Sequence, residues 1–217
     1  MAANKKAPDD PFTRFFRRPP KQARSRALVE AVLGAFEEQL AASESLAPLR
    51  LETLIERAGV GIGSFYEYFS NKDSLLGVLV GQVTERNFQT LMEALDQDFA
   101  TLEEFTDAFA ASVARAFLER PHTTRIVMEG IARFGLFRFI VEERDRFTVE
   151  LARVVHRRYL PHAAPEALHR TILILADAAI GHVTADLMRE KHPDQVSCAQ
   201  ALSAFGLAFL RARHPNP

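Results

Sequence analysis

Several residue types and patterns are scarce in this sequence of 217 residues, and each scarcity argues against a class of protein. There is no tryptophan, and the one cysteine, Cys198, excludes an intramolecular disulfide and fits a reducing compartment. We interpret Cys198 as a small residue packed in a helix, with a redox sensor as the alternative. No apolar run is long enough to cross a bilayer, and the polar, basic start is unlike a signal peptide. We therefore expect a cytoplasmic protein without a membrane partner.

The motifs of common enzyme classes are missing as well. The sequence has no Walker loop, no Gly-x-Ser-x-Gly and no His-Glu-x-x-His. Glu166 and His169 have the spacing of half a di-iron carboxylate site, but a second Glu-x-x-His is absent. We therefore predict that the chain is not an enzyme and has no catalytic residues, no metal and no cofactor.

The net charge of −1 conceals an uneven distribution. Residues 1–27 hold eight basic and two acidic side chains, a local charge of +6, so the remainder carries −7. A basic end on an acidic body is typical of a protein that contacts nucleic acid at one end, although a tail can also merely aid solubility. Residues 1–20 contain four prolines and no helical period, which predicts a disordered basic arm able to follow DNA. Three aromatic residues are unusual in such an arm and could dock on the body: Phe12, Phe15 and Phe16.

The most informative stretch lies between residues 50 and 69. Four apolar residues recur at the spacing of one face of a short helix: Leu51, Leu54, Ile55 and Ala58. Gly59 follows where a helix can end on a left-handed residue, and Gly61 can begin a second helix. In the second helix we expect Ile62, Phe65 and Phe69 to face inward. The more open residues there are Gly63, Ser64, Tyr66, Glu67 and Tyr68. Two short helices joined by a tight turn form a helix-turn-helix, whose second helix can enter the major groove of DNA.

The segment Ala58-Gly-Val-Gly-Ile-Gly-Ser-Phe-Tyr-Glu-Tyr-Phe69, followed by Ser70-Asn-Lys-Asp-Ser-Leu-Leu76, resembles the DNA-binding domain of TetR-family transcriptional regulators. The resemblance runs from about Lys21 to Val80. It implies an amino-terminal domain of three helices and a larger helical domain for dimerisation and ligand binding. The sequence departs from the family pattern in two places. Residues 37–48 are a longer connection without the family's glycine, and Arg50 stands where the family commonly has a threonine.

Three groups of residues are predicted to contact DNA, by phosphate binding, by hydroxyl groups and at the base edges. The basic side chains expected at the DNA are Arg24, Arg26, Arg50 and Lys72. The hydroxyl groups offered to the backbone are those of Tyr66 and Tyr68. The residues expected nearest the base edges are Ile62, Gly63 and Ser64.

Helical periodicity continues to the end of the chain without β alternation or internal repeats, so we predict an all-α fold. The longer predicted helices span residues 21–40, 72–98, 102–119, 122–134, 137–159, 165–191 and 197–211. We divide the chain into an arm (1–20), a helix-turn-helix DNA-binding domain (21–80) and a helical ligand-binding and dimerisation domain (81–217).

The last two helices predict how the chain assembles. The helix at 165–191 is apolar almost all round in its middle, and the helix at 197–211 alternates bulky and small residues. We therefore expect a homodimer held by these helices as a four-helix bundle. Asp177 lies in the apolar stretch, so we expect it to be buried with a charged partner, in the core or at the interface.

An effector pocket is predicted from the aromatic and polar residues of the larger domain. Its candidate lining is Phe109, Met128, Phe134, Phe137, Asp177 and His182. Plain core packing is the alternative for the apolar members. A structural or interface pair is the alternative for Asp177 and His182.

The resemblance implies a homodimeric regulator that binds double-stranded DNA at a palindromic operator. We predict a repressor that a small-molecule effector releases from its operator. An activator lacking a ligand also fits, and a helical protein-binding adaptor without DNA binding is the alternative from another class. Salt distinguishes a DNA-binding protein from the adaptor. Counterion release makes DNA affinity fall steeply as ionic strength rises, whereas the affinity of apolar docking does not depend on counterion release.

Overall fold

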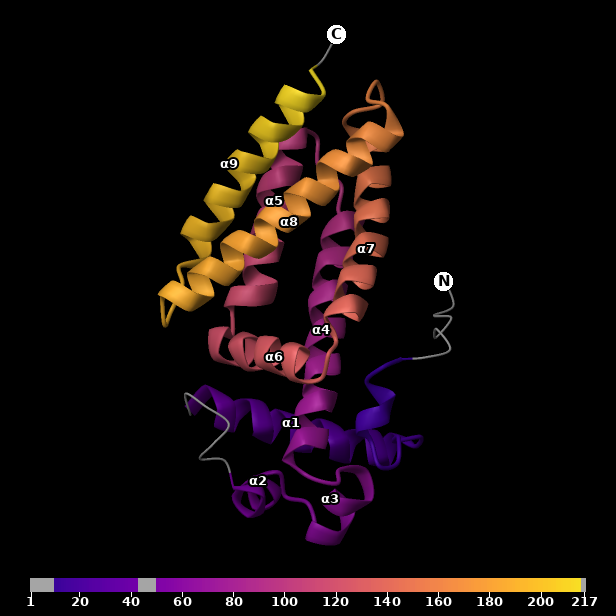
Figure 1. Cartoon of the computed structure of the whole chain (residues 1–217), viewed down its shortest axis with the longest axis vertical. Coiled ribbons are helices and arrows are strands. Elements are labelled where there is room, and N and C mark those ends of the chain that lie inside the picture. Colours follow the sequence, from indigo (N-terminus) through magenta and orange to yellow (C-terminus); the bar gives the residue numbers. More distant parts are fainter. Residues whose placement is uncertain (1–9, 43–49, 216–217) are drawn as a thin grey trace. The chain divides into compact units, whose positions relative to one another are not determined.

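In the computed structural model the chain is described over residues 10–42 and 50–215, which form helices without any strand (Figure 1). The elements of the amino-terminal part are a 3-10 helix η1 (Thr13–Phe15), α1 (Ala23–Ala42), α2 (Leu51–Arg57), α3 (Ile62–Tyr68) and α4 (Lys72–Asp96). The remaining elements are α5 (Leu102–Leu118), α6 (Pro121–Arg133), α7 (Phe137–Arg158), α8 (Pro165–Arg189) and α9 (Gln195–Arg213). The all-α prediction is confirmed. Most of the unusual connection before α2 lies outside the described residues.

The helices divide into two compact units. The first unit comprises the chain up to Thr84 together with His122–Leu136, and the second comprises Glu85–Pro121 with Phe137–Pro217. The division falls within α4, close to the predicted domain boundary at residue 80. The segment 122–136, which we assigned to the larger domain, instead joins the first unit. Gly130 allows α6 to pack closely on α4, because a Cβ atom at that position would lie only 2.6 Å from the Val80 side chain.

Local hydrogen bonds define the helix-turn-helix. Gly59 has a φ of 66°, the left-handed conformation predicted for it. Its amide donates to the Glu56 carbonyl at 3.0 Å, and the Val60 amide donates to the Ile55 carbonyl at 3.3 Å. These two bonds satisfy carbonyls at the end of α2, as in a Schellman motif. Gly61 is the N-cap of α3, as expected.

The arm does not follow the prediction of disorder over the residues that the structure describes. Asp10 accepts a hydrogen bond from the Phe12 amide at 3.0 Å just before η1, while residues 1–9 lie outside the described part. Phe15 and Phe12 lie directly over Gly77 and Gly81 of α4, where any Cβ atom would collide with the rings. The Phe15 ring is also 4.6 Å from the Phe134 ring, between centroids. Burial of these aromatic rings therefore holds the arm on α4 and the end of α6.

The second unit has its own apolar core. In it α5 packs along α9, and α7 packs along α8. Val155 of α7, Leu168 of α8 and Phe105 of α5 are all nearly inaccessible to solvent. Arg158 at the end of α7 donates to the carbonyls of Leu95 at 3.2 Å and Gln97 at 2.7 Å, so it satisfies carbonyls at the end of α4.

Helix α8 corrects the expectation that no segment could cross a bilayer. By length and composition alone Pro165–Arg189 passes that test, and only 22% of its most apolar window is buried within the chain. Ile174 and Ile180 of α8 are 44% and 46% exposed, and Phe205 of α9 is 48% exposed. The apolar middle of α8 is therefore incompletely covered by its own chain.

Candidate nucleic-acid interface

Helix α3 presents a small, open surface at its amino-terminal end. Ile62 is 59% exposed and Tyr66 is 37% exposed, and Gly63 and Glu67 are also open to solvent. A Cβ atom added to Gly63 would meet nothing within 4 Å. The opposite face is anchored by Phe65 and by Phe69, which directly follows the helix, because both rings are fully buried. The exposed side is narrow enough to approach base edges closely.

Two predictions about the faces of α3 were wrong. Ile62 was expected to face inward with Phe65, but it is the first residue of the helix and lies beyond the packed core. Tyr68 was expected to be open, but it is only 9% exposed because it shares the buried side with Phe65. In a helix of seven residues the apolar stripe is short, so its edges cannot be fixed from spacing alone. Tyr66 remains the accessible tyrosine of α3.

The folded arm brings two further cations to this surface. The Arg17 amide donates to the Tyr68 carbonyl at 2.9 Å, and the Arg17 guanidinium donates to the Tyr66 carbonyl at 3.3 Å. An open hollow of about 510 Å³ is lined by Arg17, Arg18, Gly63, Tyr66 and Glu67. Sequence reasoning placed a basic arm near DNA but did not single out Arg17 and Arg18. Their contact with α3 depends on where the arm docks, and the phenylalanines that suggested docking do not reveal its position.

The remaining predicted DNA contacts lie on three other elements. Arg24 and Arg26 are exposed in the first turn of α1, and Arg50 is exposed just before α2. Lys72 is the first residue of α4 and is half-buried, as is Ser64 of α3. The start of α4 is fixed by Asn71, whose Oδ1 accepts from the Ser74 amide at 2.9 Å. Arg133 of α6 donates to Asp73 at 2.7 Å, which links the start of α4 to α6.

The six predicted effector residues are divided between the two units. Met128 and Phe134 belong to the first unit, where Phe134 packs on Phe15. Phe137 is 61% exposed. Phe109 lies in an aromatic row of the second unit, with ring centroids 5.7 Å from Phe105 and 6.2 Å from Phe147.

The row in which Phe109 lies continues to α4, because Phe147 is 6.1 Å from Phe88. Phe88, Phe109 and Phe147 are all partly buried. An apolar molecule of matching shape would find aromatic surface beside these rings.

The expectation that Asp177 has a charged partner is confirmed, but the expectation that it is buried in the core of its own chain was wrong. Asp177 is exposed on α8 and forms an ion pair with Arg144 of α7, which also donates to the neighbouring Asp145. Within the single chain, a carboxylate in an apolar sequence run is therefore accommodated on the exposed side of α8, where its charge is paired with Arg144. His182 lies one helical turn further along and pairs with Asp186 at 3.6 Å instead.

Comparison with known proteins agrees with this geometry. Residues 38–79 match the family of bacterial regulatory proteins known as the tetR family. A putative TetR-family transcriptional regulator from Mesorhizobium loti MAFF303099 has the same fold, with a TM-score of 0.62 and 16% identity over 89% of this chain and 98% of that one. A TetR transcriptional regulator from Rhodococcus sp. RHA1 gives a TM-score of 0.50 and 19% identity over 85% of this chain and 97% of the other. No curated protein sequence gives a significant match.

The chain is thus an all-helical protein with an amino-terminal helix-turn-helix, the architecture of a DNA-binding regulator. Residues 38–79 match the DNA-binding region of the tetR family, and the chain as a whole shares the fold of the two TetR-family regulators named above.

Proposed function

We propose that this chain represses transcription by binding a palindromic operator as a two-fold dimer, and that a small apolar molecule releases it. The observation that carries DNA recognition is the open amino-terminal surface of α3, flanked by Arg17 and Arg18. Small residues at the tip allow close approach to bases, and the cations supply phosphate contacts that set the register. Glu67 lines the same hollow as the two arginines, so their charge offsets its repulsion of phosphates.

Dimerisation through α8 and α9 is supported by the apolar side chains of these helices that the rest of the chain leaves exposed. Ile174, Ile180 and Phe205 expose apolar surface on these two helices. Exposed apolar surface of this kind is a common site of association between subunits. A second copy of the chain is the occupant we propose, because a two-fold interface repeats the same patch and presents two α3 helices to one palindrome.

Salt dependence tests the DNA contacts. We expect Lys72→Ala to weaken binding to operator and to random DNA alike, and to lower the slope of log affinity against log salt by about one unit. The double variant Arg17→Ala/Arg18→Ala should lower the slope by up to about two units, since each lost phosphate contact releases one fewer counterion. Fluorescence anisotropy of labelled DNA at several salt concentrations measures both slopes.

Arg157→Ala on α7 is the matched control, because it removes an exposed arginine from the second unit. Its slope should equal that of the unaltered protein. If the slope of log affinity against log salt in the Lys72 and arginine variants equals that of the unaltered protein, those residues do not contact phosphates. A binding affinity that does not depend on salt at all would favour the protein-binding adaptor instead.

Release by an effector is proposed through the aromatic row and α4. Phe88 lies on the part of α4 that belongs to the second unit, and Lys72 begins the same helix in the first. An apolar molecule that separates Phe147 or Phe109 from Phe88 would displace a helix shared by both units, and packed helices move as rigid bodies. The DNA-reading helices of the dimer would then leave the roughly 34 Å spacing of successive major grooves.

Linkage supplies the test of the effector proposal. A compound found by thermal-shift screening should bind more weakly in the presence of operator DNA, by the same factor by which it weakens operator binding. We expect a factor of about 5–150, which is typical of allosteric coupling. Titrations with and without operator measure it, and Phe147→Ala should reduce compound binding. Equal affinities in the two titrations would exclude that compound as the inducer.

A further inference from the structure

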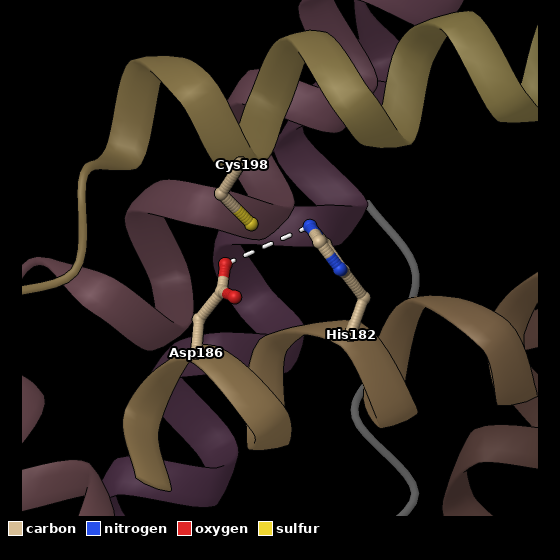
Figure 2. Close-up of side chains that lie close together, drawn as sticks. All are labelled: His182, Asp186 and Cys198. Atoms are coloured by element: carbon tan, nitrogen blue, oxygen red, sulfur yellow. Dashed lines mark ion pairs between the residues drawn. The ribbon is translucent and has the colours of Figure 1, made fainter. Parts of the chain in front are cut away.

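Three side chains with metal-binding atoms converge where α8 and α9 pack together. His182 and Asp186 lie one turn apart on α8, and Cys198 lies near the start of α9. Figure 2 shows the imidazole and the carboxylate projecting from α8 toward the Cys198 sulfur. Their ligand atoms all lie within 4.8 Å of one another. The proposed regulatory function uses none of these three contacts.

We propose that His182, Asp186 and Cys198 form a binding site for a divalent transition metal of the zinc class. The site lies entirely within one chain and one unit, and it does not depend on DNA binding or on the effector proposal.

The distance between the two ligands on α8 suits tetrahedral coordination. Metal bonds of about 2.0–2.3 Å to nitrogen, oxygen and sulfur place neighbouring ligand atoms about 3.3–3.8 Å apart. His182 Nε2 and Asp186 Oδ2 are 3.6 Å apart, within that range. The i, i+4 spacing keeps both side chains on one face of α8, and the Cys198 sulfur lies within 4.8 Å of both ligand atoms.

The donor set selects the type of metal. Thiolate and imidazole ligands favour zinc and its chemical neighbours, whereas magnesium and calcium prefer sites built from oxygen alone. Three protein ligands leave a fourth position for water or another small ligand. The cluster is open to solvent on one side, because the His182 and Asp186 side chains are 38% and 22% exposed while Cys198 is buried. A metal ion can therefore enter from solvent and reach the sulfur.

Metal binding at Cys198 has to displace the proton of the thiol. Burial, together with the charge of Asp186 and a hydrogen bond to it, raises the pKa of the Cys198 thiol to about 11. The metal-free thiol therefore stays protonated and shares its proton with Asp186. A bound dication favours the thiolate over the protonated thiol, because its positive charge attracts both the Asp186 carboxylate and the Cys198 thiolate. On binding, the S–H bond breaks, the proton passes to water and the sulfur bonds to the metal.

Cobalt(II) is the probe for this site, because its spectrum reports the ligands. We expect the full-length reduced protein, prepared without a histidine tag, to bind one Co²⁺ per chain. A near-ultraviolet thiolate-to-cobalt charge-transfer band should appear with intense visible bands of tetrahedral Co²⁺, and Zn²⁺ should displace them. Cys198→Ser should abolish the charge-transfer band. Asp186→Asn and His182→Gln should each weaken binding by at least about tenfold.

Two comparisons keep the result interpretable. His162→Gln alters an exposed histidine in the turn before α8 and should leave the cobalt spectrum and affinity unchanged. Circular dichroism in the presence of a chelator establishes that each variant is folded before metal is added, and Asp186→Asn carries the test if Cys198→Ser does not fold. Absence of a thiolate band in the unaltered protein would overturn the site. So would cobalt binding that none of the three ligand substitutions weakens.

Discussion

A charge placed on the apolar face of α8 or α9 is expected to convert the protein to a monomer. Ile180 and Phe205 are each close to half exposed in the single chain, so Asp at either position costs little in the folding of one subunit. At a subunit interface the same carboxylate would be buried without a partner, which opposes association strongly. We therefore expect Ile180→Asp and Phe205→Asp to halve the molar mass measured by light scattering.

Loss of the dimer should also reduce operator binding by about 100-fold or more, because two linked half-site contacts gain affinity from their high effective concentration. Phe137→Asp is the matched control. Phe137 is 61% exposed on α7, outside α8 and α9, and its charged variant should keep the molar mass and DNA affinity of the unaltered protein. An unchanged molar mass for both interface variants would refute an interface at these helices.

A second large effect is expected at Gly63. A side chain there meets nothing within 4 Å in the folded chain, so Gly63→Leu should fold normally. Replacing glycine inside a helix also removes an unfavourable backbone entropy of about 0.5–1 kcal/mol, so the free energy of unfolding should not fall. On DNA, however, the added isobutyl group would occupy the space needed for close approach to the base edges. Operator affinity should drop by about 100-fold, the loss of roughly two good base contacts.

Gly34→Leu provides the matched control for Gly63→Leu. Gly34 lies in α1 of the same unit and also has open space around its Cα. Its leucine variant should keep operator affinity, which separates loss of recognition from a general effect of added apolar surface. Thermal unfolding and anisotropy titrations on both variants give the comparison. Normal operator binding by Gly63→Leu would mean that the tip of α3 does not approach the bases.

Local chemistry was sufficient to predict the helix-turn-helix but not the arm. The left-handed Gly59 and the cap at Gly61 depend on residues within one turn of each other, so the printed sequence contains the whole cause. The docking of Phe15 depends on Gly77, which is distant in the chain and lacks a side chain at the contact. The phenylalanines of residues 10–20 indicated that the arm could dock, but nothing in their spacing identifies Gly77 as the partner, so the expectation of disorder was wrong for these residues.

The candidate sites show the same limit. The proposed metal ligands His182 and Asp186 are visible as a helical pair, but Cys198 joins them only through the packing of α9 on α8. Asp177 was expected inside because its sequence neighbours are apolar. Its exposure depends on the incomplete cover of α8 and on Arg144 of α7, which is a property of the tertiary structure. The effector lining was inferred from residue type alone, and residue type does not determine which distant helices share a cavity.

The path of the chain through the first unit has a practical consequence for gene fragments and chimeras. The unit is discontinuous, since the chain leaves it after Thr84 and re-enters at His122. A fragment cut at residues 21–80 would leave Gly77 without Phe15 and Val80 without Gly130, so apolar surface on α4 would face water. Transplanting the DNA-reading head onto another regulator therefore requires two separate stretches of coding sequence, the second taken from around α6.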